Sequence, residues 1–116
     1  MATFTKNKLS GSTNGKGIKV VATSSTGTTI HTAVSGTSSW DEIWIYAYNG
    51  HTANVTLTIE WGETTVPDGN IIIDIPYKSG RFLVVDGRLL QNSLVVTAFA
   101  SVANVVVMDG FINAIV

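Results

Sequence analysis

Apolar and polar residues alternate with a period of two along most of this chain. The clearest case is the segment 55–61, in which Thr56, Thr58 and Glu60 separate apolar residues at every second position. Such alternation is typical of an antiparallel strand with one face in a core and the other in water. Apolar residues nowhere keep a 3.6-residue repeat over three turns, so the pattern predicts almost no helix. The predicted strands are 18–23, 28–34, 41–48, 54–61, 70–75, 81–85, 93–99 and 104–112.

Short segments rich in Gly, Asn, Asp and Ser separate these strands, because such residues tolerate positive φ or form local side-chain hydrogen bonds. The predicted breaks are Ser25-Thr26-Gly27, Asn49-Gly50, Pro67-Asp68-Gly69, Ser79-Gly80, Asp86-Gly87 and Asp109-Gly110. About eight strands at this spacing predict an all-β fold, a single antiparallel β-sandwich or jelly-roll-like domain over residues 18–116. Residues 1–17 are expected to form an extended N-terminal arm that the fold does not need.

Some predicted strands are apolar or amphipathic on both faces. In the segment 41–48, Ile43 and Ile45 point one way, whereas Trp44, Tyr46 and Tyr48 point the other. With no helix to cover the second face, these surfaces favour burial against a neighbouring subunit. The alternative is a monomer that leaves a few apolar side chains exposed, as many soluble proteins do.

Composition and charge narrow the range of partners. The 116 residues are 45% hydrophobic but only 13% charged, about half the usual charged fraction, which also favours self-association. The formal net charge of -1 and the lack of a basic run give no source of nucleic-acid affinity. There are no cysteines, so thiolate chemistry is excluded. Without a signal-peptide pattern or a long apolar segment, we expect a protein made in the cytoplasm and not bound to a membrane.

Residues that could carry chemistry are isolated in the sequence, so we expect no enzyme, no cofactor and no metal site. The segment 11–17 is glycine-rich but has the wrong spacing for a phosphate-binding loop, and it precedes a strand where a helix would be needed. His31 is expected at the surface or in an interface, and His51 at a hairpin tip. Asp41 and Glu42 are adjacent and therefore point to opposite faces of a strand, which prevents them from acting together.

A sugar-binding module is the main alternative from another functional class. Five aromatic residues could form a flat platform on which pyranose rings stack: Trp40, Trp44, Tyr46, Tyr48 and Trp61. A platform requires exposed, coplanar rings, whereas an assembly interface requires packed ones.

Several segments resemble small proteins encoded among the virion genes of tailed bacteriophages. They are Ser10-Gly11-Ser12-Thr13-Asn14-Gly15-Lys16-Gly17-Ile18, Thr29-Ile30-His31-Thr32-Ala33-Val34, Asp41-Glu42-Ile43-Trp44-Ile45-Tyr46-Ala47, Leu57-Thr58-Ile59-Glu60-Trp61-Gly62, Asn92-Ser93-Leu94-Val95-Val96 and Gly110-Phe111-Ile112-Asn113. The resemblance implies a virion structural protein, most like a capsid decoration or cement protein. Such proteins are typically trimers that sit on the outer shell, bind the major capsid protein and stabilise the head.

This resemblance leads to two predicted contact surfaces. The homotrimer contact is predicted to involve Trp44, Tyr46, Tyr48, Phe111, Ile112 and Val116. The capsid contact is predicted to involve the arm, with Lys6, Lys8, Asn14 and Lys16. A head-to-tail connector or a tail structural protein remains the alternative virion position.

Overall fold

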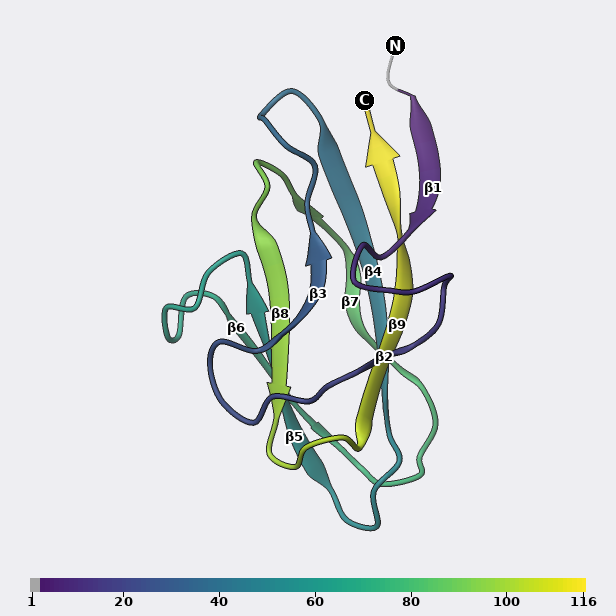
Figure 1. Cartoon of the computed structure of the whole chain (residues 1–116), viewed down its shortest axis with the longest axis vertical. Helices are drawn as coiled ribbons and strands as arrows, with labels where there is room; N and C mark the ends of the chain where they lie inside the picture. Colours follow the sequence, from purple (N-terminus) through teal and green to yellow (C-terminus); the bar gives the residue numbers. More distant parts are fainter. Residues whose placement is uncertain (1–2) are drawn as a thin grey trace.

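The computed structural model describes residues 3–116 and confirms the all-β sandwich. Figure 1 shows the strands running along the long axis of an elongated molecule that measures 48 × 27 × 21 Å. No helix occurs among the described residues, so none of them forms a helix that could cross a membrane. The strands are β1 (Phe4–Lys8), β2 (Ile18–Lys19), β3 (Thr28–Thr32), β4 (Trp40–Asn49), β5 (Val55–Trp61), β6 (Asn70–Ile75), β7 (Phe82–Leu90), β8 (Val95–Ala100) and β9 (Val106–Ile115).

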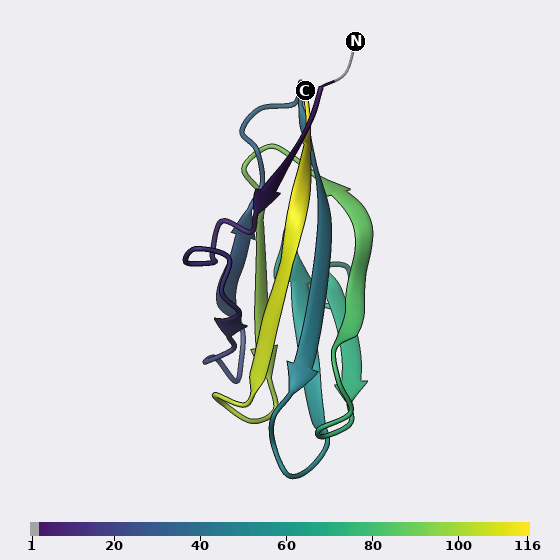
Figure 2. The same cartoon turned by 90° about the vertical axis from the view of Figure 1, so that its right-hand side faces the viewer.

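Two antiparallel sheets pack face to face, as the side view in Figure 2 shows. Sheet A has the strand order β1-β9-β4-β7, and the short strand β2 also pairs with β9. Sheet B has the order β3-β8-β5-β6. The edges of the sandwich are therefore β1 and β2 with β3 on one side, and β7 with β6 on the other.

The core lies between the sheets and follows the alternation seen in the sequence. Ile43 and Ile45 on β4 and Leu57 and Ile59 on β5 are completely buried. Each such side chain contributes roughly 1.5–3 kcal/mol to stability by leaving water. The intervening residues of β4 point outward, which creates the outer face of sheet A.

The Asp86-Gly87 turn prediction is wrong, because this dipeptide lies inside β7. Opposite Ile43 and Trp44 the register of β7 shifts from Arg88 to Asp86, so Gly87 is an extra residue in the ladder. Its φ of 84° is one that glycine adopts without strain. The dipeptide therefore forms a β-bulge that lets the strand continue.

The Asp109-Gly110 turn prediction is also wrong, because this dipeptide lies in the middle of β9. Gly110 pairs with Ile45 at a very close approach of the two strands. A Cβ atom at this position would lie 2.0 Å from the carbonyl oxygen of Trp44. Glycine is thus required here by the contact between β9 and β4, and no change of chain direction is involved.

The N-terminal segment is part of the sandwich. β1 pairs with β9 over five residues, from Phe4 opposite Ile115 to Lys8 opposite Phe111. Leu9, directly after β1, is completely buried in the core. A segment that completes a sheet and contributes a core residue cannot be removed without cost, which differs from the dispensable arm expected from the sequence.

Candidate functional site

The outer face of sheet A carries most of the aromatic residues that the sequence singles out. Trp40, Trp44, Tyr46 and Tyr48 share this face because they occupy alternate positions of β4. Trp61 does not join them: it points into the core and is 8% exposed. The predicted platform of five rings is therefore a row of four.

Cross-strand neighbours cover part of these rings. Trp44 and Phe111 lie opposite each other on β4 and β9, with ring centroids 6.1 Å apart and planes 13° from parallel. The ammonium of Lys6 lies 4.2 Å from the Phe111 ring centre, and the guanidinium of Arg81 lies 4.0 Å from that of Tyr46. Such cation–π contacts occupy ring faces that a sugar would need for stacking.

Three charged groups on this face, Arg81, Asp109 and Glu42, have polar partners within the chain. Arg81 forms a salt bridge with Asp109, with 2.7 Å between Nη2 and Oδ1. Glu42 accepts hydrogen bonds from Asn113 Nδ2 (2.9 Å) and Trp44 Nε1 (2.8 Å), and these bonds lower the pKa of its carboxyl. These carboxylates hold the side chains of the face in place.

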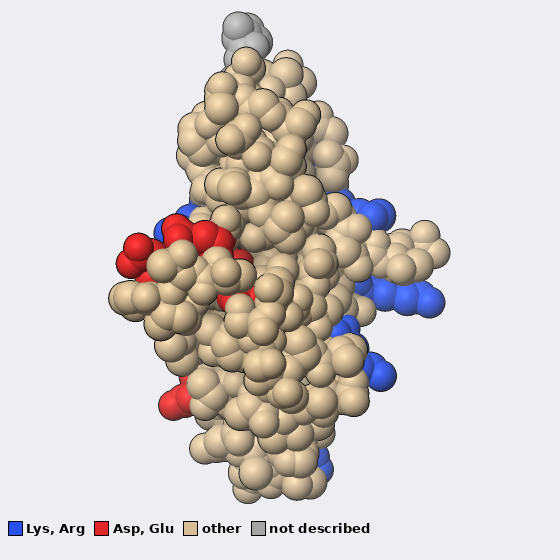
Figure 3. Space-filling model, turned by 60° about the vertical axis from the view of Figure 1, so that its left-hand side comes forward, with Lys and Arg blue, Asp and Glu red and all other residues tan. Residues whose placement is uncertain are grey.

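One end of the sandwich is apolar and exposed. Phe4, Ile115 and Trp40 form a single row across β1, β9 and β4. Phe4 is 65% exposed, Trp40 is 40% exposed and the adjacent Val116 is 68% exposed. We call these four residues the terminal patch. In Figure 3 the corresponding end of the molecule shows no Lys, Arg, Asp or Glu.

The structure places several residues of the two predicted contact surfaces differently from the prediction. Ile112 is 3% exposed and belongs to the core, so it cannot contact another subunit without unfolding. Lys6 and Lys8 lie on the outer face of sheet A, opposite Asn113 and Phe111, and thus share the face predicted for the trimer contact. The remaining predicted capsid contacts, Asn14 and Lys16, lie in the loop between β1 and β2.

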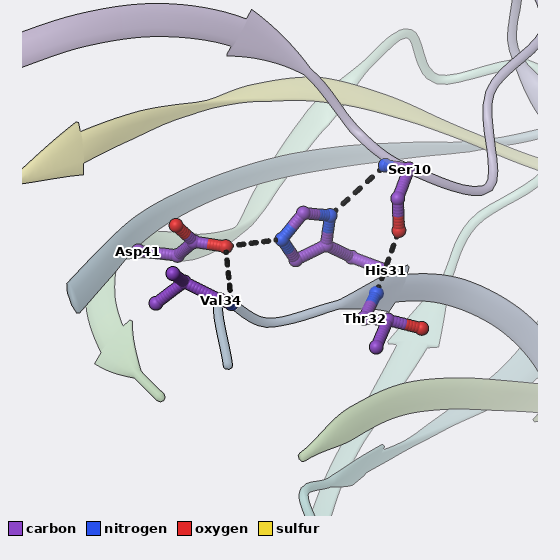
Figure 4. A network of polar contacts seen from close by, with 5 residues as sticks. All are labelled: Ser10, His31, Thr32, Val34 and Asp41. Carbon is purple, nitrogen blue, oxygen red and sulfur yellow. Dashed lines mark hydrogen bonds and ion pairs between the residues drawn. The ribbon is translucent and has the colours of Figure 1, made fainter. Parts of the chain in front are cut away.

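His31 is buried within the chain, which corrects its expected place at the surface or in an interface. Its Nε2 lies 2.8 Å from Asp41 Oδ2, and its Nδ1 accepts a hydrogen bond from the backbone N–H of Ser10 (2.9 Å), as Figure 4 shows. Because a backbone N–H can only donate, the ring is neutral and its proton is on Nε2, which donates to Asp41. Thr32 N–H donates to Ser10 Oγ and Val34 N–H donates to Asp41 Oδ2.

This network joins three parts of the chain, and its ring and carboxylate side chains are buried. The side chains of His31 and Asp41 are 5% and 6% exposed. Ser10 follows β1, so the network fastens the N-terminal segment to β3 and β4. His51, by contrast, lies in the loop between β4 and β5, where its backbone N–H donates to Asn49 Oδ1.

A second buried carboxylate is Glu60, for which the alternation in the sequence predicts a solvent-facing position. It lies on the outer face of sheet B but is 1% exposed, because the loop between β2 and β3 covers it. It accepts hydrogen bonds from Ser25 Oγ (2.5 Å), Thr97 Oγ1 (2.6 Å) and the backbone N–H of Gly27 (2.8 Å). Burial raises the pKa of Glu60, but these three bonds outweigh it and lower the pKa below its ordinary value. The carboxylate anchors the loop.

An open pocket of about 250 Å³ lies beside this anchor. Thr26, Leu94, Val95 and Thr97 are among its lining residues. The Thr97 hydroxyl already donates to Glu60. In the part of the chain that the structure describes, no group of three His, Asp or Glu side chains is placed to hold a metal ion.

Comparisons with protein-family models, curated proteins and solved structures gave no match for this chain.

Proposed function

We propose that this protein is a non-enzymatic structural protein of a tailed-bacteriophage virion, in the role of a capsid decoration protein. In this role it forms a homotrimer and binds the major capsid protein on the outer shell of the head. The observation that carries the proposal is the uncovered apolar surface of sheet A, above all the terminal patch. Exposed apolar surface of this kind marks contacts with other proteins.

The positions of the polar clusters support a structural role. His31 and Asp41 are buried, and so is Glu60. Each makes hydrogen bonds that join segments distant in sequence. Groups used in this way stabilise a fold, whereas catalytic groups must reach a substrate.

The shape of the molecule suggests how the surfaces are divided. The terminal patch is at one end of the 48 Å axis, and the outer face of sheet A runs along that axis. We place the shell contact at the terminal patch and the contacts between copies along the side. This replaces the free arm as the shell contact, because β1 is paired with its own β9.

A two-stage experiment tests this function. Light scattering at several concentrations gives the mass of the purified protein, and a trimer is expected. Co-sedimentation with heads that lack their decoration protein then tests shell binding. Phe4→Ser combined with Trp40→Ser should weaken sedimentation with heads, whereas Tyr77→Ser should not, because Tyr77 is a 52% exposed aromatic residue in the loop between β6 and β7. A wild-type protein that is monomeric and does not sediment with heads would contradict the proposal.

The same preparation separates the alternatives. Binding to tails or to the head vertex in place of the shell would indicate a tail or connector protein. Binding of oligosaccharides by a monomer would indicate a sugar-binding module. The cation–π contacts of Lys6 and Arg81 weigh against sugar binding, because they cover the faces of Phe111 and Tyr46.

A further inference from the structure

Charge is divided unevenly along the chain. Residues 1–40 contain four lysines and no Asp or Glu, namely Lys6, Lys8, Lys16 and Lys19. Residues 20–77 contain six acidic residues and no Lys or Arg, namely Asp41, Glu42, Glu60, Glu63, Asp68 and Asp74. With a net charge of only -1, the protein has little overall charge, so any electrostatic steering must come from this division.

The lysines form one edge of the sandwich. Lys8 and Lys19 lie opposite Phe111 and Val107 of β9, on the edge of sheet A made by β1 and β2. Both are exposed. Together with Lys6 and with Lys16 in the intervening loop, they form what we call the basic edge.

The exposed acids gather on the other side. Of the six acidic residues in 20–77, Asp41 and Glu60 are buried and Glu42 is hydrogen-bonded on sheet A. The remaining three are exposed on β6 or in the loop before it, and we call them the acidic edge: Glu63, Asp68 and Asp74. Figure 3 shows the Asp and Glu side chains on one side of the molecule and most of the Lys and Arg side chains on the other, although one basic group also lies beside the acidic ones.

An apolar side chain accompanies the acidic edge. Ile72 is 63% exposed on the outer face of β6, two residues before Asp74. The basic edge is likewise continuous with the aromatic outer face of sheet A, because Lys8 lies in the same row as Phe111 and Trp44. Each edge therefore combines charge with apolar surface, and the two charges are opposite.

We propose that these edges bind each other between copies: the basic edge of one subunit contacts the acidic edge of the next. In that contact, the aromatic face of sheet A covers Ile72 of the neighbour. This inference rests on the self-association in the proposed function and specifies its geometry. A two-fold contact of either edge with itself would bring like charges together, which electrostatic complementarity disfavours. The contact is therefore head-to-tail, and such a contact closes into a ring when the rotation between subunits allows it.

Two charge-reversed variants test the geometry. The basic-edge variant carries Lys8→Glu and Lys19→Glu, and the acidic-edge variant carries Glu63→Lys and Asp68→Lys. All four side chains are exposed, so neither variant should lose its fold. Circular dichroism and the urea midpoint check this. Each variant alone should associate at least about tenfold more weakly than wild type, because attractive contacts between opposite charges become repulsive.

An equimolar mixture of the two variants gives the decisive readout. Each variant then meets its opposite charge only on the other variant, so association should return, with the two chains alternating. Alternating chains close only into rings with an even number of subunits, so a wild-type trimer should not reappear. Mass photometry or light scattering reports the number of subunits. The control is Lys78→Glu, which reverses an exposed charge in the loop between β6 and β7, outside both edges and off the outer face of sheet A, and should leave the mass unchanged.

The outcomes separate the two proposals. A wild-type protein that is monomeric at every concentration overturns self-association and this inference together. A wild-type oligomer that persists in both variants overturns the edge contact alone and leaves the proposed function standing. A mixture that fails to associate, or a wild-type dimer that resists charge reversal, also refutes the head-to-tail arrangement. Association that returns only in the mixture supports it.

Discussion

Replacing Glu60 should destabilise the fold far more than replacing a neighbouring exposed carboxylate. Glu60→Leu removes the acceptor for Ser25, Thr97 and Gly27 and leaves three polar groups without a partner at the base of the β2–β3 loop. Hydrogen bonds to a charged group contribute about 1.5–3 kcal/mol each, and desolvation of the carboxylate offsets several kcal/mol of their sum. We expect a net loss of about 3 kcal/mol in the free energy of unfolding.

Glu60→Gln should cost less, about 1 kcal/mol, because the amide oxygen still accepts from Gly27 and Thr97 while the charge is lost. Urea denaturation followed by tryptophan fluorescence measures both variants, with an unchanged slope showing that the unfolded state is the same. Glu63→Leu and Glu63→Gln are the matched controls, since Glu63 is exposed three residues later, in the loop after β5. Equal losses at the two positions would refute the anchor.

The pH dependence of stability provides a second readout of the same bonds. The pKa of Glu60 is lowered in the folded protein, so its contribution is fully present above the ordinary value of about 4.3. That contribution is lost as the pH falls from there through the lower folded pKa. Wild type should therefore lose stability more steeply than Glu60→Gln below about pH 4.3. If the free energy of unfolding of wild type and Glu60→Gln fell in parallel with pH, the Glu60 carboxylate would not be the group that links stability to pH.

Three further outcomes follow from the packing. Gly110→Ala should lower the free energy of unfolding, measured by urea denaturation, by at least about 2 kcal/mol. The reason is that the added Cβ would lie 2.0 Å from the Trp44 carbonyl oxygen. A neutral effect would mean that β9 and β4 separate easily. His31→Leu should cost about 3 kcal/mol and accelerate hydrogen exchange at the Ser10 amide, which loses its acceptor. Unchanged exchange would contradict the fastening of the N-terminal segment through His31. Leu9→Ala should cost about 2–5 kcal/mol, and a cost under 1 kcal/mol would show that the N-terminal segment is not part of the core.

The sequence predicted the strands whose alternation is uninterrupted. β6 occupies residues 70–75 as predicted, and β4 extends the predicted strand by one residue at each end. Asp41 and Glu42 point to opposite faces, as a period of two requires. Local pattern is enough in these cases, because neighbouring residues alone decide which side chains share a face.

Features that depend on distant segments could not be predicted. Gly87 and Gly110 look like turn residues, and only the partner strand β4 shows that one forms a bulge and the other a close contact. His31 and Glu60 look like residues of solvent-facing positions, yet Ser10 and the loop at 25–27 return to cover them. The pairing of β1 with β9 could not be predicted either, because the alternation near residue 4 is too short to indicate a strand.

The central position of β9 in sheet A has a consequence for folding during synthesis. β9 is the only partner that the structure gives to β1 and β2 within the described residues, and it also pairs with β4 along its whole length. Ribosomes make the chain from its N-terminus, so the strands within residues 4–19 are synthesised long before their partner strand. Phe4, for example, pairs with Ile115, about one hundred positions later. Contacts this distant in sequence make folding slow, in the range of milliseconds to seconds. The nascent chain therefore exposes the unpaired edge of β4 until residues 106–115 leave the ribosome, and chaperones that bind exposed strands would act in that interval.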